Sequence, residues 1–408
     1  MKLAACQRFH PDRAPHGWDI EPIKNRIRLE YGEGLTDAER HHGPYSVFGS
    51  NGQVGTHSTY LIQGPGILVG RKGSVGEVHY SEGNFWPIDT VYYVKRLGED
   101  NWRYLYYLLK YLNLGQLNAA TGVPGLTRRD AHFILGAFPQ PIEQEAISGV
   151  LSLADHSLAA ANTKLSAARR LKTALMQQLF TQGLPGRHNR LNIATVFRHD
   201  FEVPDSWDVA PLRASIQTVE YGTNAASNDG KHGLPVVAIP EVIAPRFRLA
   251  ECSYAEVSEQ EAAALRLQPD DVLLIRTNGN SDYIGKSTVI GDEAAARHII
   301  FASYLIRIRT LKGKLSGRYL NYFLASPLGR RQCLAMANTS AGNHNLGSRA
   351  IKHFLFPRPS PAEQADIVAM MDAAEDAIEA SQEEIVALER LKRSLLQNLL
   401  TGRARVRI

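Results

Sequence analysis

The sequence has few cysteines and lacks the long apolar runs of membrane proteins. Its 408 residues include only Cys6, Cys252 and Cys333, which lie far apart and form no CxxC pair. This distribution argues against a disulfide scaffold and fits a reducing compartment. There is no apolar run of 18 residues and no signal-peptide pattern. We therefore expect a cytoplasmic protein with no membrane-spanning helix.

Recognisable catalytic signatures are also missing. The glycines between Gly64 and Gly76 fit neither GxGxxG nor GxxxxGK[ST]. The Asn/Asp-Pro-Pro-aromatic tetrapeptide of amino-group DNA methyltransferases is absent, and residues 87–95 lack one acidic residue of a nuclease core. The fourteen histidines show no ordered spacing with cysteine. We therefore predict no catalytic residue, no metal site and no cofactor in this chain.

Length, charge and apolar content point to a globular protein of several parts. A chain of 408 residues with 44% hydrophobic residues suits about two to four domains. The net charge of +5 at pH 7 is compatible with a polyanionic partner.

One stretch of the chain occurs twice. Residues 141–181 and 361–401 align without a gap at an offset of 220, and 14 of the 41 aligned positions are identical. Both copies open with Pro-x-Glu-Gln and contain Arg-Leu-Lys near the end. Such density over an ungapped span identifies an internal repeat.

Each copy of the repeat has the pattern of a long helix with a coiled-coil seam, because apolar and small residues recur at alternating steps of four and three. The expected seam residues are Ile147, Leu151, Leu158, Leu165, Leu171, Leu175 and Leu179, and then Ile367, Met371, Ile378, Ile385, Leu391, Leu395 and Leu399. Strict periodicity would place Lys172 and Lys392 on the seam. We expect Leu171 and Leu391 to replace them through a register shift shared by both copies, where the helices would cross.

Two readings of these helices are open. They could be ordinary amphipathic helices on separate cores, or a mutual pair. The equal lengths, the shared shift and the small seam residues favour a pair with a seam of about 50 Å.

The segments that precede the two helices resemble each other loosely. Residues 18–22 (Trp-Asp-Ile-Glu-Pro) mirror residues 207–211 (Trp-Asp-Val-Ala-Pro), and residues 66–71 correspond to 271–276. Short strands broken by glycine turns and a helix rich in Tyr and Leu predict an α+β fold. The predicted parts are a globular domain (1–140), a helix with a linker (141–190), a second globular domain (191–355) and a second helix (356–408).

Polar and basic side chains follow a buried strand in each globular domain. Arg and Lys can bond guanine, and Asn can bond adenine through two hydrogen bonds. The candidate DNA-binding residues are Asn51, Arg71, Lys72, Ser74, Arg128 and Arg129 in the first domain, and Arg276, Asn278, Asn280, Lys286, Asn343, His344, Asn345 and Arg349 in the second. A base contact, a phosphate contact and a structural role are all open for each of them. For Arg71 and Arg276, the structural alternative is a tie between a turn and a carboxylate.

Taken together, the ordered double set resembles the specificity (S) subunits of type I restriction–modification systems. The segments that carry the resemblance are Pro141–Thr181 and Pro361–Gly402, then Ile67–Gly76, Gly122–Leu126, Leu274–Gly279 and Ile284–Lys286. Residues 1–14 contain no feature that we can place in the family.

The resemblance implies two target recognition domains, each of which reads one half of an asymmetric bipartite site in the major groove of double-stranded DNA. The helices would pair as an antiparallel coiled coil with a pseudo-twofold arrangement and bind two methyltransferase (M) subunits. S-adenosylmethionine would belong to the M subunit, and ATP and Mg to any R subunits. The chain itself would be non-enzymatic. The alternatives are a single-chain DNA methyltransferase or nuclease with a cryptic catalytic site, and a coiled-coil scaffold without a DNA role.

Overall fold

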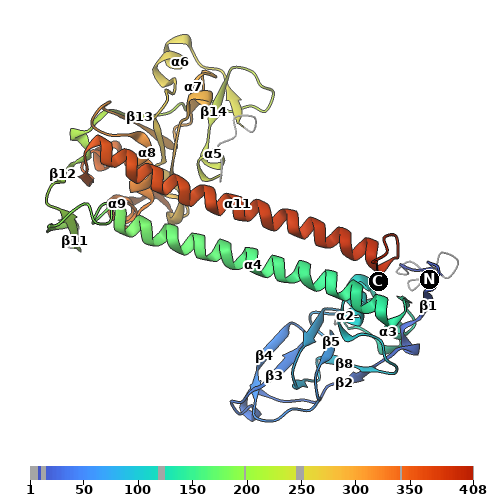
Figure 1. Cartoon of the computed structure of the whole chain (residues 1–408). Helices are drawn as coiled ribbons and strands as arrows, with labels where there is room; N and C mark the ends of the chain where they lie inside the picture. The colour runs from blue at the N-terminus through green and yellow to red at the C-terminus, as the bar shows by residue number, and fades with distance from the viewer. Residues whose placement is uncertain are drawn as a thin grey trace. The chain divides into compact units, whose positions relative to one another are not determined.

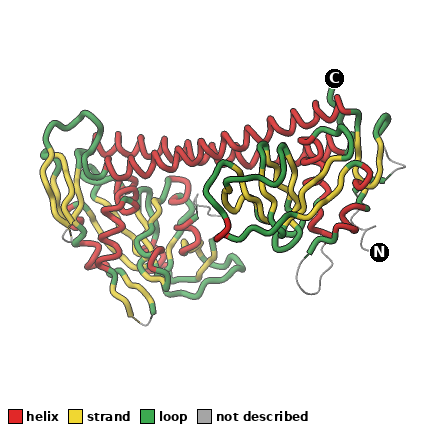
Figure 2. Tube along the Cα trace, turned by 90° about the horizontal axis from the view of Figure 1, so that it is seen from below, coloured by secondary structure: helices red, strands yellow, loops and turns green. Residues whose placement is uncertain are grey.

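The structure, a computed structural model, describes residues 8–10, 15–117, 125–196, 199–244, 252–340 and 342–407. The chain forms two compact units, unit 1 (1–163 with 382–408) and unit 2 (164–381). Helices and strands are mixed in both units (Figure 2), which confirms the predicted mixed content. No helix within the described ranges is both long enough and apolar enough to cross a bilayer.

Unit 1 is centred on a four-stranded antiparallel sheet in the order β2-β8-β5-β6. The central strand β5 is a run of apolar residues and glycine, and it is buried throughout. Tyr104, Leu105 and Leu108 of α2 pack in the same core as Ile67 and Val69 of β5. The sheet consists of β2 (Ile27–Tyr31), β8 (Val91–Arg96), β5 (Gly66–Gly70) and β6 (Val78–Ser81), and α2 is Trp102–Leu112.

The other elements of unit 1 form two smaller sheets and short helices. A three-stranded sheet has the order β4-β3-β7, and β1 pairs with β9. Their bounds are β1 (Asp19–Pro22), β3 (Tyr45–Gly49), β4 (Gly52–His57), β7 (Phe85–Pro87), β9 (Leu135–Phe138), η2 (Ile23–Asn25), η3 (Asp37–Glu39), η4 (Leu114–Leu117) and α3 (Arg128–His132).

Unit 2 repeats this plan. Its four-stranded antiparallel sheet has the order β13-β20-β16-β18, and the pair β12–β23 corresponds to β1–β9. The bounds are β13 (Ile216–Tyr221), β20 (Leu305–Thr310), β16 (Val272–Ile275), β18 (Ser287–Val289), β12 (Asp208–Pro211), β23 (Leu355–Arg358), η5 (Leu212–Ala214), α8 (Gly317–Ala325), α9 (Pro327–Met336) and α10 (Ser348–Lys352).

Unit 2 also contains a hairpin and two three-stranded sheets, of which β15-β14-β19 has the same layout as β4-β3-β7 of unit 1. The hairpin is β10–β11, and the sheets have the orders β15-β14-β19 and β17-β22-β21. The bounds are β10 (Leu191–Val196), β11 (His199–Pro204), β14 (Leu234–Val237), β15 (Ser253–Ala255), β19 (Ile300–Phe301), β17 (Thr277–Asn278), β21 (Asn338–Ser340), β22 (Asn343–Asn345), α5 (Ile239–Ile243), α6 (Glu259–Leu265), α7 (Asp292–Ala295) and η7 (Ser281–Tyr283).

The two repeats are the long helices α4 (Pro141–Leu179) and α11 (Pro361–Leu400), drawn in green and red in Figure 1. Both begin at the proline of the repeat, which confirms the helical prediction. The first half of α4 and the last half of α11 belong to unit 1, and the remaining halves belong to unit 2.

Within each unit the two helix segments contact each other in antiparallel order. In unit 1, Ile147 and Leu151 share a core with Leu399, and Lys392 forms an ion pair with Asp155. In unit 2, residues 175–180 share a core with residues 367–371, and the Lys172 Nζ lies 2.6 Å from the Glu375 Oε1. The residue numbers rise along one helix as they fall along the other.

The predicted register shift is wrong. Leu171 and Leu391 are 57% and 51% exposed, whereas Lys172 and Lys392 are half-buried. A lysine can bury its aliphatic stem while its ammonium group reaches a carboxylate, so the strict period continues through both lysines.

The other expected seam residues follow this unshifted period. Ile147, Leu151, Leu179, Ile367, Met371 and Leu399 are buried, and Leu158, Leu165, Leu175, Ile378, Ile385 and Leu395 are partly buried.

A buried carboxylate at the start of each helix explains why both copies keep Pro-x-Glu-Gln. The Trp18 Nε1 donates to Glu143 at 3.0 Å, and the Trp207 Nε1 donates to Glu363 at 3.0 Å. The other Glu143 oxygen accepts from the Arg405 Nε at 2.6 Å. In unit 2 the His188 Nε2 takes this place, 2.6 Å from Glu363. Because a buried charge needs partners, each glutamate joins a domain start to the segment that follows the opposite helix.

The neighbouring glutamines bond the backbone in the same way in both units. Gln144 accepts from the Asn101 N–H at 2.8 Å and donates to the Pro139 carbonyl at 2.9 Å. Gln364 accepts from the Ser316 N–H at 2.9 Å and donates to the Pro359 carbonyl at 3.1 Å. The Glu-Gln pair therefore docks each helix on its own domain.

We predict that Glu143→Ala destabilises unit 1. It leaves the indole N–H of Trp18 buried without an acceptor, which should lower the free energy of unfolding by about 1–3 kcal/mol. Urea unfolding followed by tryptophan fluorescence measures the loss. The exposed Glu145, two residues along the same helix, provides the control. Glu145→Ala should change stability by no more than about 0.5 kcal/mol, and equal stability of the two variants would contradict the role of Glu143.

Candidate nucleic-acid interface

Arg71 and Arg276 occupy equivalent positions directly after the central strands β5 and β16. The Arg71 Nη1 donates to the Asp89 carbonyl at 2.8 Å, and the Arg276 Nη1 donates to the Ser303 carbonyl at 3.1 Å. The backbone carbonyls of both arginines also accept a bond, from the N–H of Leu126 at 2.9 Å and of Leu346 at 2.7 Å. Each arginine therefore has a structural role in part. Its guanidinium group bonds a backbone carbonyl instead of the carboxylate that was considered from the sequence.

A tyrosine that the sequence reasoning missed lies beside each arginine. Tyr31 ends β2 and Tyr221 ends β13, and both are largely exposed, at 51% and 43%. The Arg71 guanidinium carbon lies 4.9 Å from the centre of the Tyr31 ring, and the Arg276 carbon lies 4.7 Å from that of Tyr221. Both distances are typical of a cation stacked on an aromatic face.

A tripeptide that occurs twice in the sequence marks these tyrosines. The tripeptide Glu-Tyr-Gly occurs at residues 30–32 and again at 220–222. A Cβ atom on Gly32 would lie 2.2 Å from the Ile88 carbonyl oxygen, and one on Gly222 would lie 2.1 Å from that of Phe301. Close backbone approach therefore requires glycine after both tyrosines, and a search for repeats outside the helices would have found them.

A short helix brings a further group to each tyrosine. In unit 1 the Arg128 guanidinium of α3 lies 5.2 Å from the Tyr31 ring and 3.3 Å from a Glu30 oxygen. In unit 2 the Ser348 N–H of α10 donates to the Tyr221 hydroxyl at 3.0 Å. Burial raises the pKa of Tyr221, but the bonds to Ser348 and the charges of Arg276 and Lys352 outweigh it and lower the pKa overall.

The remaining predicted residues of unit 1 lie on neighbouring segments. Asn51 is in the β3–β4 turn, and its side-chain oxygen accepts from the Ser74 hydroxyl at 3.5 Å. Lys72 is exposed and bridges to Gly125, and Arg129 is exposed on α3. One hydrogen bond thus joins Asn51 to Ser74, and Arg71 and Arg128 both lie over the ring of Tyr31. Residues 122–124 of the predicted loop lie outside the described residues.

In unit 2 half of the predicted residues lie on one small sheet. Strand β17 pairs with β22, which places Thr277 opposite Asn345 and Asn278 opposite His344. Asn343 lies on the same strand β22. Arg349 is exposed on α10, and the Lys286 Nζ lies 4.5 Å from the centre of the Tyr283 ring.

The side-chain oxygens of two predicted asparagines already accept hydrogen bonds from nearby backbone N–H groups. The Asn278 Oδ1 accepts from the Asn280 N–H at 2.8 Å, and the Asn280 Oδ1 accepts from the Asp282 N–H at 2.9 Å. Asn280 thereby caps η7. A bidentate contact with adenine uses the amide oxygen as well as the nitrogen. The side-chain oxygens of both asparagines therefore have a structural role.

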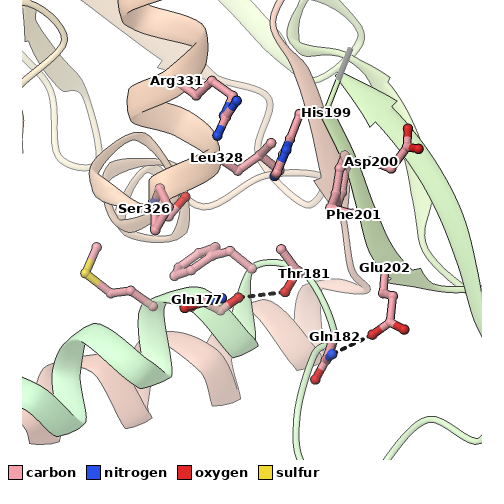
Figure 3. Close-up of a pocket in the computed structure, with 13 residues that line it drawn as sticks. Gln177, Thr181, Gln182, His199, Asp200, Phe201, Glu202, Ser326, Leu328 and Arg331 are labelled. Atoms are coloured by element: carbon pink, nitrogen blue, oxygen red, sulfur yellow. Dashed lines mark hydrogen bonds between the residues drawn. The ribbon is translucent and has the colours of Figure 1, made fainter. Parts of the chain in front are cut away.

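A cavity of about 480 Å³ in unit 2 is separate from these residues (Figure 3). It lies where the end of α4 meets β11 and the start of α9, and Gln182 donates to Glu202 at 2.6 Å at its edge. None of the predicted DNA-binding residues lines it. The cavity does not contribute to the interface.

Reactive groups are scarce in the part of the chain that the structure describes. It contains no group of three His, Cys, Asp or Glu residues placed to hold a metal ion. Burial raises the pKa of the Cys333 thiol to about 12, which keeps it protonated and unreactive at neutral pH.

Residues 31–163 match the model of the type I restriction modification DNA specificity domain. The chain is 23% identical over 201 residues to the specificity subunit assigned to the type I restriction enzyme MjaX of Methanocaldococcus jannaschii, covering 49% of this chain and 47% of that one. It is 26% identical over 185 residues to the specificity subunit of the type I restriction enzyme EcoKI of Escherichia coli K12, covering 44% and 39%. The alignments therefore span less than half the length of each relative.

Among solved structures, the fold is similar to a type I restriction–modification S subunit from M. genitalium. The TM-score is 0.61 at 15% identity, and the match covers 94% of this chain and 96% of that one. At this level of identity the likeness concerns the fold alone.

The capping role of Asn280 can be tested by substitution. Asn280→Ala should lower the stability of unit 2 by about 0.5–2 kcal/mol, because the Asp282 N–H loses its acceptor. Asn280→Asp keeps that acceptor and should unfold at nearly the wild-type temperature. Differential scanning calorimetry distinguishes the two variants, and an Asp variant as unstable as the Ala variant would exclude a capping role.

Proposed function

Because the chain belongs to the family of type I restriction–modification specificity subunits, we propose that it is the DNA sequence-specificity subunit of such a complex. Each unit acts as a target recognition domain for one half of a bipartite DNA site. The observation that carries this proposal is the duplicated site. In both units an arginine and a tyrosine lie together where strands of the equivalent four-stranded sheet end.

The two half-sites differ in sequence, because the side chains around the shared arginine and tyrosine differ. Unit 1 offers Asn51, Lys72 and Ser74, whereas unit 2 offers Asn343, His344 and Asn345. Base edges in the major groove present distinct donors and acceptors, so unlike sets of side chains select unlike bases. An asymmetric bipartite site follows.

Helices α4 and α11 pair along their whole length as an antiparallel coiled coil with pseudo-twofold symmetry. In support, the ion pair of Asp155 with Lys392 and that of Glu375 with Lys172 are related by the repeat offset of 220 residues. The 39 residues of α4 span about 58 Å at 1.5 Å each. Such a pair acts as a spacer that holds two recognition domains at a fixed separation along the DNA.

The outer faces of this pair bind two methyltransferase M subunits. A pseudo-twofold coiled coil presents two near-equivalent surfaces to two copies of one partner. Leu171 and Leu391 are equivalent in the repeat and largely exposed, so they are candidate contacts. S-adenosylmethionine and the methyl-transfer chemistry then belong to the M subunits, and ATP and Mg to any R subunits. This chain recognises DNA in the cytoplasm and does not catalyse a reaction.

We expect methylation by the host complex to depend on this chain, one domain for each half-site. Replacing residues 1–140 with the matching domain of another specificity subunit should change one half of the methylated motif and leave the other half intact. Replacing residues 191–355 is the matched control and should change the opposite half. Genome-wide mapping of methylated bases reads out both exchanges.

Methylation mapping, together with an assay of the purified chain, separates the alternatives. A motif in which both halves change after one exchange would contradict independent readers. Methylation that is unaffected by deletion of the chain would favour a scaffold without a DNA role. Methyl transfer by the purified chain alone would favour a single-chain enzyme.

The spacer role predicts a change in spacing alone. Inserting seven residues at equivalent points of both helices keeps the 3.5-residue period and adds about 10 Å, or about three base pairs. The methylated motif should keep both half-sites and gain that spacing. The same insertion in α4 only should break the pairing and abolish methylation. Unchanged spacing after the double insertion would show that the helices do not set it.

A further inference from the structure

The two units share a small set of residues at the candidate interface, although the loops around them have diverged. Resting on the proposed function, we propose that Tyr31 with Arg71, and Tyr221 with Arg276, form the same DNA phosphate clamp in both recognition domains. The clamp fixes each domain on the DNA backbone, and neighbouring residues that differ between the units read the bases.

The argument begins with what two readers of unlike sequences can share. A residue that discriminates bases must differ between the domains wherever the half-sites differ. A phosphate group is present at every step of any sequence, so a phosphate contact can be the same in both. The duplicated Glu-Tyr-Gly tripeptide and the duplicated arginine are therefore suited to the backbone.

The geometry holds each guanidinium group in place before DNA arrives. One Nη atom is bonded to a backbone carbonyl, at 2.8 Å for Arg71 and 3.1 Å for Arg276, and the guanidinium carbon lies over an exposed tyrosine ring. A guanidinium has five N–H donors and suits the oxygens of a phosphate. Holding it against the ring reduces the conformational entropy that binding would otherwise cost.

The surrounding charge favours an anion. Arg128 lies against Tyr31 in addition to Arg71, and in unit 2 both Arg276 and Lys352 act on Tyr221. The Tyr221 hydroxyl is also held by Ser348 at the start of α10. One carboxylate, Glu30, neutralises part of the Arg128 charge. Two cations thus act on an exposed tyrosine in each unit.

The test uses Arg71→Gln and Arg276→Gln, each in the whole 408-residue chain. Affinity is measured over a range of salt concentrations for a selected duplex and for a random duplex, and the bound motif is obtained by selection from random duplexes. Each variant should bind both duplexes more weakly by a similar factor, on the order of tenfold. The slope of log K against log salt should fall by about 1, and the selected motif should not change.

Two control variants distinguish a phosphate contact by the arginine from a purely structural role. Arg276→Lys keeps the charge and should retain the wild-type salt slope. Arg297→Gln removes an exposed charge from the α7–β19 connection, outside the proposed clamp, and should leave the slope unchanged. Asn345→Ala, by contrast, should alter the motif at one half-site and leave the slope as it is.

Several outcomes would overturn the clamp. Loss of selectivity at one base position in Arg276→Gln would make the arginine a base reader. A lower melting temperature with an unchanged salt slope would make it structural. A wild-type chain that binds DNA with salt dependence but selects no motif would count against the proposed function alone. Failure of the wild-type chain to bind any DNA would overturn both.

Discussion

The burial of one glutamate at the start of each long helix is the constraint on which the rest of the structure depends. Glu143 and Glu363 are each about 3% exposed, so their charges must be bonded within the protein. Each receives the indole N–H of a tryptophan that opens a domain and a basic side chain that follows the opposite helix. The adjacent glutamines bond the domain backbone. One short motif therefore organises each unit.

In the seam between the helices, partly buried charges are likewise bonded within the protein. Lys172 and Lys392 interrupt an apolar stripe, yet each lies half-buried and bonds a carboxylate of the other helix in its own unit. Their stems fill the seam as an apolar residue would. Leu171 and Leu391 are consequently turned outward, where they are free to contact a partner.

The candidate interface combines a constant part with a variable part. The constant part is an arginine after a buried central strand and a tyrosine at the end of a neighbouring strand. The variable part comprises loops and a small sheet that differ in length and composition between the units. Because the sheet supports the constant part rigidly, the loops can change without moving it.

By itself, the sequence determined the repeat, the two long helices from their prolines onward and the equivalent positions of Arg71 and Arg276. These are local patterns, in which period, proline position and spacing suffice. Only the tertiary structure decided that Lys172 rather than Leu171 faces the seam, that Tyr31 and Tyr221 stack on the arginines, and that Asn280 caps a turn. These outcomes depend on groups distant in the sequence, such as Glu375 beside Lys172, and no local pattern specifies a partner of that kind.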